Sequence, residues 1–317
     1  MVGTPSATNP YRARGLAPLK GETHLHTVHS DGKDTPAVML EACRQAGYDF
    51  AAITDHNTIS GHGEARAAAA DLGLVLLPGA ELTTFHGHAV CLGIERMPEW
   101  RDLETRGMDA FAADVHAQGG LLQVSHPTRL GSPACTGCAW EWPVSPSSLD
   151  LWEIFSGANP VHPHSALSAL FWRRLLDGGG HATPVAAGDV HSRAAAAAAR
   201  PATYVYASES SASAVLDGLR AGRLFSSAGQ RLDLWLEGPS QQPVLVGERA
   251  PAAHSWRARI DVEPGDGYTT RLVFNRRGQI QLLPSGAMVA GPGWVYAEVV
   301  DGSEGSPRAV TAPIWMV

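Results

Sequence analysis

Short, largely apolar segments recur through the first two hundred residues, and they constrain the fold more than any other feature of this sequence. Continuous apolarity is what a strand covered on both faces requires, whereas a strand with one wet face alternates. The sequence therefore predicts a sheet with helices packed on it. The segments are Phe50 to Thr54, Leu74 to Leu77, Leu121 to Val124, Leu149 to Ile154 and Thr183 to Ala187.

Helix-like stretches separate these predicted strands. Thr35 and Pro36 supply an N-cap and a first-turn proline, and Gly47 follows the end of that helix. A second helix is expected from Gly63 to Leu72 and a third from Met108 to Gln118, each followed by glycine. Strands that alternate with helices indicate parallel βα units.

Beyond about Ala228 the pattern changes to β-rich runs with glycine and proline turns, and no helical pattern separates them. This change predicts a small antiparallel β module. We expect an N-terminal lead-in at residues 1–19, an α/β barrel domain at 20–228 and a β-rich domain at 229–317. The runs are Leu232 to Leu236, Arg257 to Val262, Arg271 to Phe274, Trp294 to Val299 and Ala309 to Trp315.

Polar side chains follow the predicted strands at equivalent places. His56, Glu81, His126, Asp189 and His191 each come shortly after an apolar run. In βα barrels the carboxyl ends of the strands form the active face, so these side chains are expected to meet there.

Two pairs of residues share an i, i+2 spacing that suits metal binding. His24 and His26 would point to the same face of an extended strand, and Asp189 with His191 repeats the spacing. Asp31 follows in a turn that can fold its carboxylate back toward the same pocket. Buried histidines and carboxylates without partners would be costly, so the pattern predicts a metal centre.

Nitrogen and oxygen ligands without thiolate suit Mn²⁺, Fe²⁺ or Zn²⁺. Two such cations about 4 Å apart can hold a hydroxide between them and clamp the attacking and leaving oxygens. We expect hydrolysis of a phosphoester in a small metabolite or nucleotide. The same hydroxide could attack a carbonyl carbon, so a carbamate or ester hydrolase is the alternative.

Five segments, taken in order, resemble the successive motifs of the PHP (polymerase and histidinol phosphatase) superfamily over about residues 20–228. The segments CTGCAWEWP, RPATYVYA, AGRLFSS and APIWMV further resemble its carbaryl-hydrolase-like branch. The resemblance implies a distorted seven-stranded βα barrel followed by a small C-terminal β module. The five segments are GETHLHTVHSDG, AAITDHNT, GAELTT, VSHP and GDVHS.

The resemblance also implies two or three divalent metal ions. His88 matches a position that can complete the second site, with nearby His86 as the alternative. Glu81, Asp189 and His191 are expected to be catalytic. The first cation would be held by His24, His26, Glu81 and Asp189, the second by Glu81 and His126, and the third by Asp31, His56 and His191.

Three further residues near these motifs have expected roles. Arg129 and Arg193 would contact an anionic substrate, and a salt bridge at the barrel mouth is the alternative for each. Asp55 precedes His56 and is expected to orient or cap other groups rather than bind metal.

The composition limits the classes of molecule that this protein is expected to bind. The formal charge of −7 argues against a nucleic-acid binder, although bound cations would still admit a small anionic substrate. An exonuclease and a scaffold with a degenerate barrel are the remaining alternatives. The exonuclease lacks a basic or aromatic tract, and the scaffold conflicts with the intact ligand set.

Neither membrane insertion nor export is indicated. No apolar run approaches the roughly 18 residues that span a bilayer, and Met1 to Lys20 lacks the apolar core of a signal peptide. We expect a cytoplasmic protein, and a homo-oligomer is compatible with the sequence. For Cys135 and Cys138, a disulfide or a packed loop is favoured over zinc, which would need a second cysteine pair.

Overall fold

The computed structural model describes residues 9–129, 139–160, 162–198, 200–239, 242–263, 267–301 and 305–317. Cys135 and Cys138 lie outside these ranges. The helices are α1 Pro10–Ala13, α2 Pro36–Gln45, α3 His62–Leu72, α4 Leu103–Arg106, α5 Met108–His116, α6 Pro163–Asp177, α7 Arg193–Ala197 and α8 Ala212–Ala221, with a 3₁₀ turn at Pro146–Ser148. None of these described helices is long and apolar enough to cross a membrane.

The strands fall into two groups along the chain. Those of the α/β part are β1 Ala17–Glu22, β2 Phe50–Ile53, β3 Val75–Thr84, β4 Gly87–Leu92, β5 Leu121–Ser125, β6 Leu151–Ser156, β7 Thr183–Ala187, β8 Ala202–Ala207 and β9 Leu224–Ser227. Those that follow are β10 Arg231–Glu237, β11 Val244–Leu245, β12 Arg249–Ala250, β13 Ser255–Glu263, β14 Thr269–Arg276, β15 Gln279–Leu283, β16 Met288–Ala290, β17 Gly293–Val300, β18 Pro307–Thr311 and β19 Ile314–Met316.

The α/β strands form one curled sheet. Its order is β9-β8-β1-β2-β3-β4-β5-β6-β7, and the residues of β2, β4, β5 and β7 are buried throughout. The sheet curls so far that β7, at one end of this order, lies next to β8 and β9 at the other end. There the Thr203 hydroxyl bonds to the backbone of Ala186, and the Ser226 hydroxyl donates to the Pro184 carbonyl.

The sheet is mixed rather than built from parallel βα units throughout. β1, β2 and β3 run parallel, as do β5, β6 and β7, but β4 is antiparallel to both β3 and β5. The reason is the short connection from Thr84 to Gly87, which permits only a hairpin, whereas a parallel crossover needs a dozen residues or more. The α/β fold with a curled sheet is confirmed, but a count of seven barrel strands is not.

Of the three helices that the sequence predicts, α2 and α3 have bounds within about a residue of those expected, and α5 ends at His116 rather than Gln118. The Thr35 side chain accepts from the backbone N–H of Val38 at the start of α2, and Pro36 occupies the first turn. Gly73 ends α3 in the left-handed conformation, with φ of 62°. These helices bury Met39, Leu40 and Ala65 against the sheet, so the strand ends that carry the polar residues have a rigid support.

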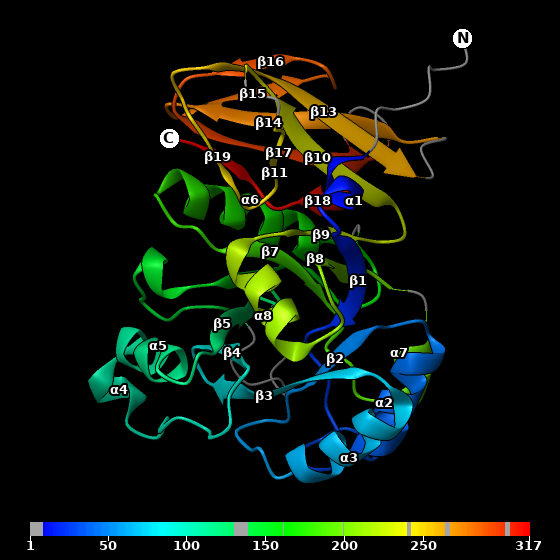
Figure 1. Cartoon of the computed structure of the whole chain (residues 1–317). Coiled ribbons are helices and arrows are strands. Elements are labelled where there is room, and N and C mark those ends of the chain that lie inside the picture. The colour runs from blue at the N-terminus through cyan, green and yellow to red at the C-terminus, as the bar shows by residue number, and fades with distance from the viewer. Residues whose placement is uncertain are drawn as a thin grey trace.

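The C-terminal strands form two sheets. β10, β11, β13 and β16 make a separate four-stranded antiparallel sheet, whereas β18 pairs with β9 and so continues the main sheet into β17, β19 and β12. Figure 1 shows these strands, coloured yellow to red, stacked at one end of the molecule above α6. The predicted boundary near residue 229 thus falls within a chain of hydrogen-bonded strands.

Residues 9–19 are built into the fold. Tyr11 is 1% exposed and stacks on Tyr206, and its hydroxyl donates to the Leu234 carbonyl at 2.6 Å while accepting from the Val246 N–H. The N-terminal segment therefore joins the last α/β strands to the four-stranded sheet, a role that its sequence does not indicate.

Tyr11→Phe removes a buried hydroxyl and leaves the Leu234 carbonyl and the Val246 N–H without that partner. We expect a loss of about 1–3 kcal/mol in the free energy of unfolding, measured by urea denaturation. Tyr268→Phe is the matched control, because Tyr268 is only partly buried and packs through its ring. A loss for Tyr11→Phe no larger than for the control would contradict the bridging role.

Candidate metal centre

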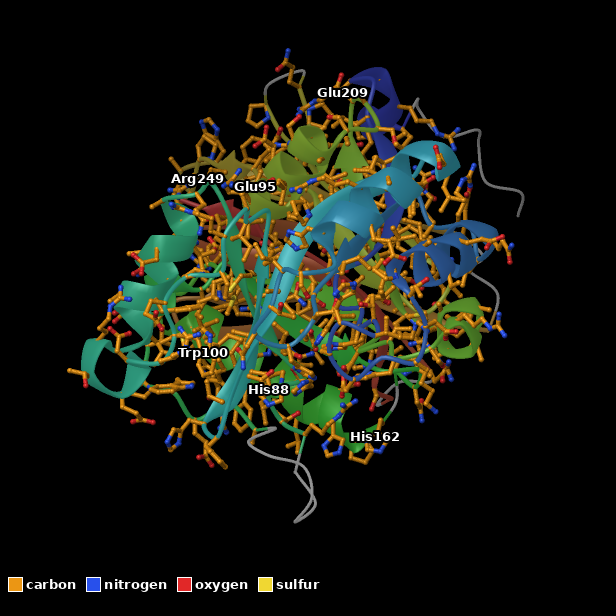
Figure 2. All side chains as sticks on the ribbon, turned by 90° about the horizontal axis from the view of Figure 1, so that it is seen from below. His88, Glu95, Trp100, His162, Glu209 and Arg249 are labelled. Atoms are coloured by element: carbon orange, nitrogen blue, oxygen red, sulfur yellow. The ribbon has the colours of Figure 1, made fainter. Side chains whose placement is uncertain are left out.

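The polar residues at the strand ends converge on one buried carboxylate. Glu81 is fully buried in β3; β1, β5 and β7 end around it, and the antiparallel β4 begins there. His88 of β4 is 6% exposed, and Figure 2, seen from below, labels it among the crowded side chains of this face. The residues that could hold a cation fall into three overlapping groups: His24, His26 and Glu81; Glu81, His88 and His126; and His26, Asp31, His56 and His191.

The first group lies deepest. His24 Nε2 is 3.2 Å from Glu81 Oε1, and His26 Nε2 is 3.4 Å from Glu81 Oε2. Asp189 faces the same space, with its Oδ1 3.3 Å from His26 Nε2 and 3.7 Å from His24 Nε2. Both histidines are fully buried. The His24/His26 pair follows β1 and Asp189 follows β7, so the two expected pairs reach this space from different strands.

The second group shares Glu81 with the first. Its Oε1 lies 3.3 Å from His88 Nδ1 and 3.4 Å from His126 Nε2. His88 thus faces the centre, whereas His86 lies near Glu104 and Glu141 on the surface. Of the two histidines left open by the sequence, His88 is the one placed to bind a metal.

The third group lies at the mouth. Asp31 is 56% exposed, and its Oδ1 is 3.2 Å from His191 Nε2 and 3.4 Å from His56 Nε2. The turn that returns Asp31 depends on Gly32, because a Cβ there would lie 2.5 Å from the His26 backbone. Asp55 holds the turn by accepting from the Thr27 backbone and hydroxyl and from Ser30, which is the capping role expected of it.

The arrangement of the buried ligand atoms suits binding to a metal ion better than hydrogen bonding to one another. His24 Nε2, both ring nitrogens of His26 and both Glu81 oxygens have no hydrogen-bond partner of acceptable geometry among the described residues. Such orphaned groups are costly in a protein interior. Ligands about 2.1 Å from a tetrahedral cation lie about 3.4 Å apart, which matches the spacing of these atoms.

The electrostatics of the centre also require positive charge. Burial alone would raise the pKa of Glu81, but His24 and contacts with His126 and His56 lower it well below its usual range. The same carboxylate shifts the pKa of His24 in the opposite direction. Burial alone would lower this pKa, but Glu81 and Glu153 raise it well above the usual value. A cation between these groups would supply the charge that a proton supplies otherwise.

Strained backbone marks the strand ends. His126 and Asp189 have φ of 29° and 49°, and Asn57, next to His56, has φ of 52°. Non-glycine residues in this region cost of the order of 1–3 kcal/mol unless their surroundings hold them there, and they cluster at functional sites. At His126 and Asp189 the strained residue presents its side chain to the centre shortly after its strand, whereas Asn57 bonds to the backbone of Thr83.

Two buried glutamates escaped the sequence analysis. Glu153 of β6 is fully buried and accepts three hydrogen bonds, from His24 Nδ1 at 2.8 Å, Gln123 Nε2 at 2.9 Å and the His126 backbone N–H at 2.6 Å. Its signal was an acidic residue within the predicted strand LDLWEI, three residues after Asp150.

Glu22 is the second of these glutamates and lies at the end of β1. One of its oxygens accepts from the backbone N–H groups of both His24 and Gly188. This oxygen therefore connects the segment that follows β1 to the loop that carries Asp189. Burial raises the pKa of Glu22 to about 7.

The two arginines have different surroundings. Arg129 donates to Asp189 Oδ2, which places it beside the centre. Arg193 is the first residue of α7, and its side chain is 71% exposed and lies 3.8 Å from Asp34. No described contact brings it to the residues that could hold a metal. Of the remaining histidines, His62 bonds to the Gly79 carbonyl and His116 to Asp150, away from the centre.

A buried cluster of imidazoles and carboxylates at the strand ends of a curled α/β sheet is the arrangement of a metal-dependent hydrolase. Comparison with known families supports that class, since residues 22–135 match the PHP domain. This stretch contains seven of the nine predicted metal ligands, from His24 to His126. The comparisons do not test the carbaryl-hydrolase-like branch, which stays a prediction.

Individual relatives agree with the domain match. The chain is 29% identical over 129 residues to an uncharacterised protein of Methanocaldococcus jannaschii, covering 37% of this chain and 71% of that one. It is 36% identical over 78 residues to a 3′,5′-nucleoside bisphosphate phosphatase of Chromobacterium violaceum, covering 23% of this chain and 27% of the phosphatase.

A solved structure extends the similarity of fold to almost the whole chain. A two-domain protein of Bacteroides vulgatus, described as containing a PHP-like metal-dependent phosphoesterase, superposes with a TM-score of 0.57 at 15% identity and covers 95% of both chains. The arrangement of the α/β part and the C-terminal strands therefore recurs in another protein.

Glu153→Gln tests how the centre is supported. Three donors converge on the Glu153 carboxylate, and an amide offers one acceptor oxygen in place of two. We expect Mn²⁺ affinity, measured by competition with a chelator, to fall roughly ten- to a hundredfold, as for other groups that orient metal ligands. The exposed Glu263→Gln is the matched control, and equal affinities in the two variants would show that Glu153 does not position the ligands.

Proposed function

We propose that this chain is a metal-dependent phosphoesterase that hydrolyses a small phosphorylated molecule at the centre around Glu81. The observation that carries the proposal is the set of buried His24, His26 and Glu81 atoms that face one another at 3.2–3.4 Å and that have no well-formed hydrogen bond to any described residue. The match to the PHP domain and the similarity to a nucleoside bisphosphate phosphatase support a phosphoester as the substrate.

Each group of residues would hold one divalent cation of Mn, Fe or Zn. We assign His24, His26, Glu81 and Asp189 to the first, Glu81, His88 and His126 to the second, and Asp31, His56 and His191 to the third. When bound, the cations would activate water and neutralise the charge of the phosphate.

The chain itself supplies position and shielding. Glu81 lies between the first two groups, so its two oxygens fix their separation. Burial of His24 and His26 keeps solvent away from the inner ligands, whereas the exposed Asp31 leaves the mouth open to substrate. Arg129 orients Asp189 and presents a positive charge where a phosphate oxygen would arrive.

Loss of an inner ligand should remove metal and activity together. We expect wild-type protein purified without chelator to hold at least about two transition-metal equivalents per chain, measured by elemental analysis. His24→Ala and Asp189→Ala should lower the metal content, and should lower phosphomonoesterase activity with added Mn²⁺ at least about a hundredfold.

The exposed His254→Ala is the matched control for these variants. Full activity in His24→Ala or Asp189→Ala would contradict the proposed centre. A wild-type protein that hydrolyses aryl carbamates or oligonucleotides but no small phosphoester would contradict the proposed substrate class.

Arg129→Ala separates phosphate binding from support of Asp189. A phosphoryl group presents several charged oxygens, whereas a carbamate carbonyl does not, so kcat/KM should fall on the order of 10²–10³-fold for phosphoesters and much less for carbamates. The comparison is made at equal metal content. Equal losses on both substrates would mean that Arg129 acts only through Asp189.

A further inference from the structure

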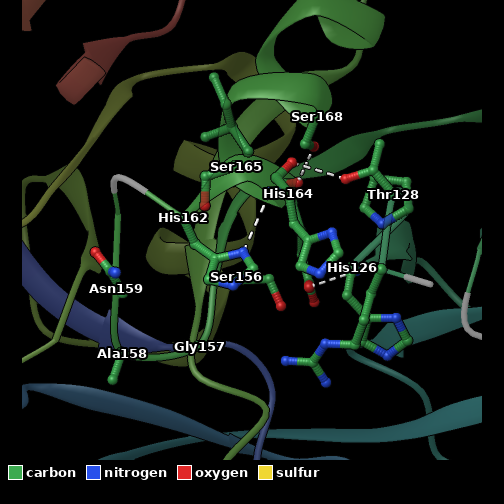
Figure 3. Close-up of a pocket in the computed structure, with 14 residues that line it drawn as sticks. His126, Thr128, Ser156, Gly157, Ala158, Asn159, His162, His164, Ser165 and Ser168 are labelled. Atoms are coloured by element: carbon green, nitrogen blue, oxygen red, sulfur yellow. Dashed lines mark hydrogen bonds between the residues drawn. The ribbon is translucent and has the colours of Figure 1, made fainter. Parts of the chain in front are cut away.

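A cavity of about 440 Å³ opens directly beside the metal centre and is not explained by it. It begins at His126 and Arg129 and extends under the first turn of α6, where it is lined by His162, Ser165 and Ser156, the last residue of β6. Figure 3 shows Ser156, His162 and Ser165 grouped around this space. We call it the α6 pocket.

Two hydroxyl groups in the α6 pocket lack partners. Ser165 is 3% exposed, and neither its Oγ nor the buried Oγ of Ser156 has a hydrogen-bond partner among the described residues. Nearby Ser168 differs, because its hydroxyl donates to the Glu153 carbonyl. Buried hydroxyls are normally satisfied, so the first two serines have donors to offer a ligand.

The surrounding charge favours an anion. α6 is 15 residues long, and its N-terminus, the positive end of the helix dipole, faces the pocket through His162 and Ser165. His162 Nδ1 accepts from the His164 N–H, so a neutral His162 ring carries its proton on Nε2 and can donate. Arg129, which is paired with Asp189, also lines the pocket.

The acidic residue that lines the pocket does not oppose this charge. Both oxygens of Glu153 are occupied by His24, Gln123 and the His126 backbone. Burial lowers the pKa of His164, and the nearby His162 and Arg129 lower it further.

We infer that the α6 pocket binds a second anionic group of the substrate, a phosphate or a carboxylate, while the scissile phosphate lies at the metal centre. The inference rests on the proposed phosphoesterase function and narrows it to substrates with two anionic ends. Ser156 and Ser165 would hold the second group with charge-assisted hydrogen bonds, and Arg129 lies between it and the scissile phosphate.

Non-hydrolysable ligands test the pocket apart from catalysis. α,ω-Alkanebisphosphonates with two, four and six carbons are titrated calorimetrically into the Mn²⁺-loaded protein beside the matching alkylphosphonates. We expect at least one bisphosphonate to bind roughly tenfold more tightly than its partner, beyond the roughly twofold gain that two equivalent ends give. The matching ω-carboxyalkylphosphonates show whether the pocket also accepts a carboxylate.

Added negative charge should abolish that preference. Ser165→Asp and, independently, Ser156→Asp should bring the ratio of the two affinities close to the statistical value. Ser210→Asp, at an exposed position, should keep the wild-type ratio. Two variants are used because either aspartate could impair folding.

The outcomes separate the two proposals. A wild-type protein without preference at any chain length, or Asp variants that fold and keep it, would overturn the anion pocket. A clear preference without hydrolysis of any phosphoester would instead contradict the proposed function and leave the pocket standing. Absence of binding by both ligand types would overturn the pocket.

Discussion

Buried negative charge is the constraint on which the rest of this structure depends. Glu22, Glu81 and Glu153 are at most 1% exposed, and Asp189 lies among them at the strand ends. Arg129 compensates Asp189, and the charge of Arg200 acts on Glu22, but Glu81 faces only imidazoles among the described side chains. Divalent cations would neutralise the remaining negative charge and so offset the free-energy cost of burying these carboxylates.

The fold meets this constraint by local strain and long-range support. The backbone turns sharply at His126 and Asp189, and Glu153 then holds the His126 N–H from a neighbouring strand. Glu22 does the same for the loop that carries Asp189, through the Gly188 N–H. A centre held in this way loses its geometry when a supporting carboxylate is altered, even though that carboxylate binds no metal.

Much of the site could be predicted because its signals are local. His24 and His26 are spaced i, i+2 just after β1, and His56 and Asp189 follow apolar runs. What could not be predicted depends on pairing between distant segments. The antiparallel placement of β4, the contact of Arg193 with Asp34 and the burial of Tyr11 between two sheets follow from register and packing, which composition and periodicity do not specify.

The central claim is that the unpaired atoms around Glu81 are metal ligands, and anomalous X-ray diffraction from crystals grown with Mn²⁺ tests it most directly. The account predicts strong anomalous peaks between Glu81 and His24, His26 and Asp189, and between Glu81 and His126, each about 2.1 Å from the ligand atoms. A fully ordered site with no anomalous signal next to Glu81, and with its carboxylate bonded to protonated histidines, would contradict it.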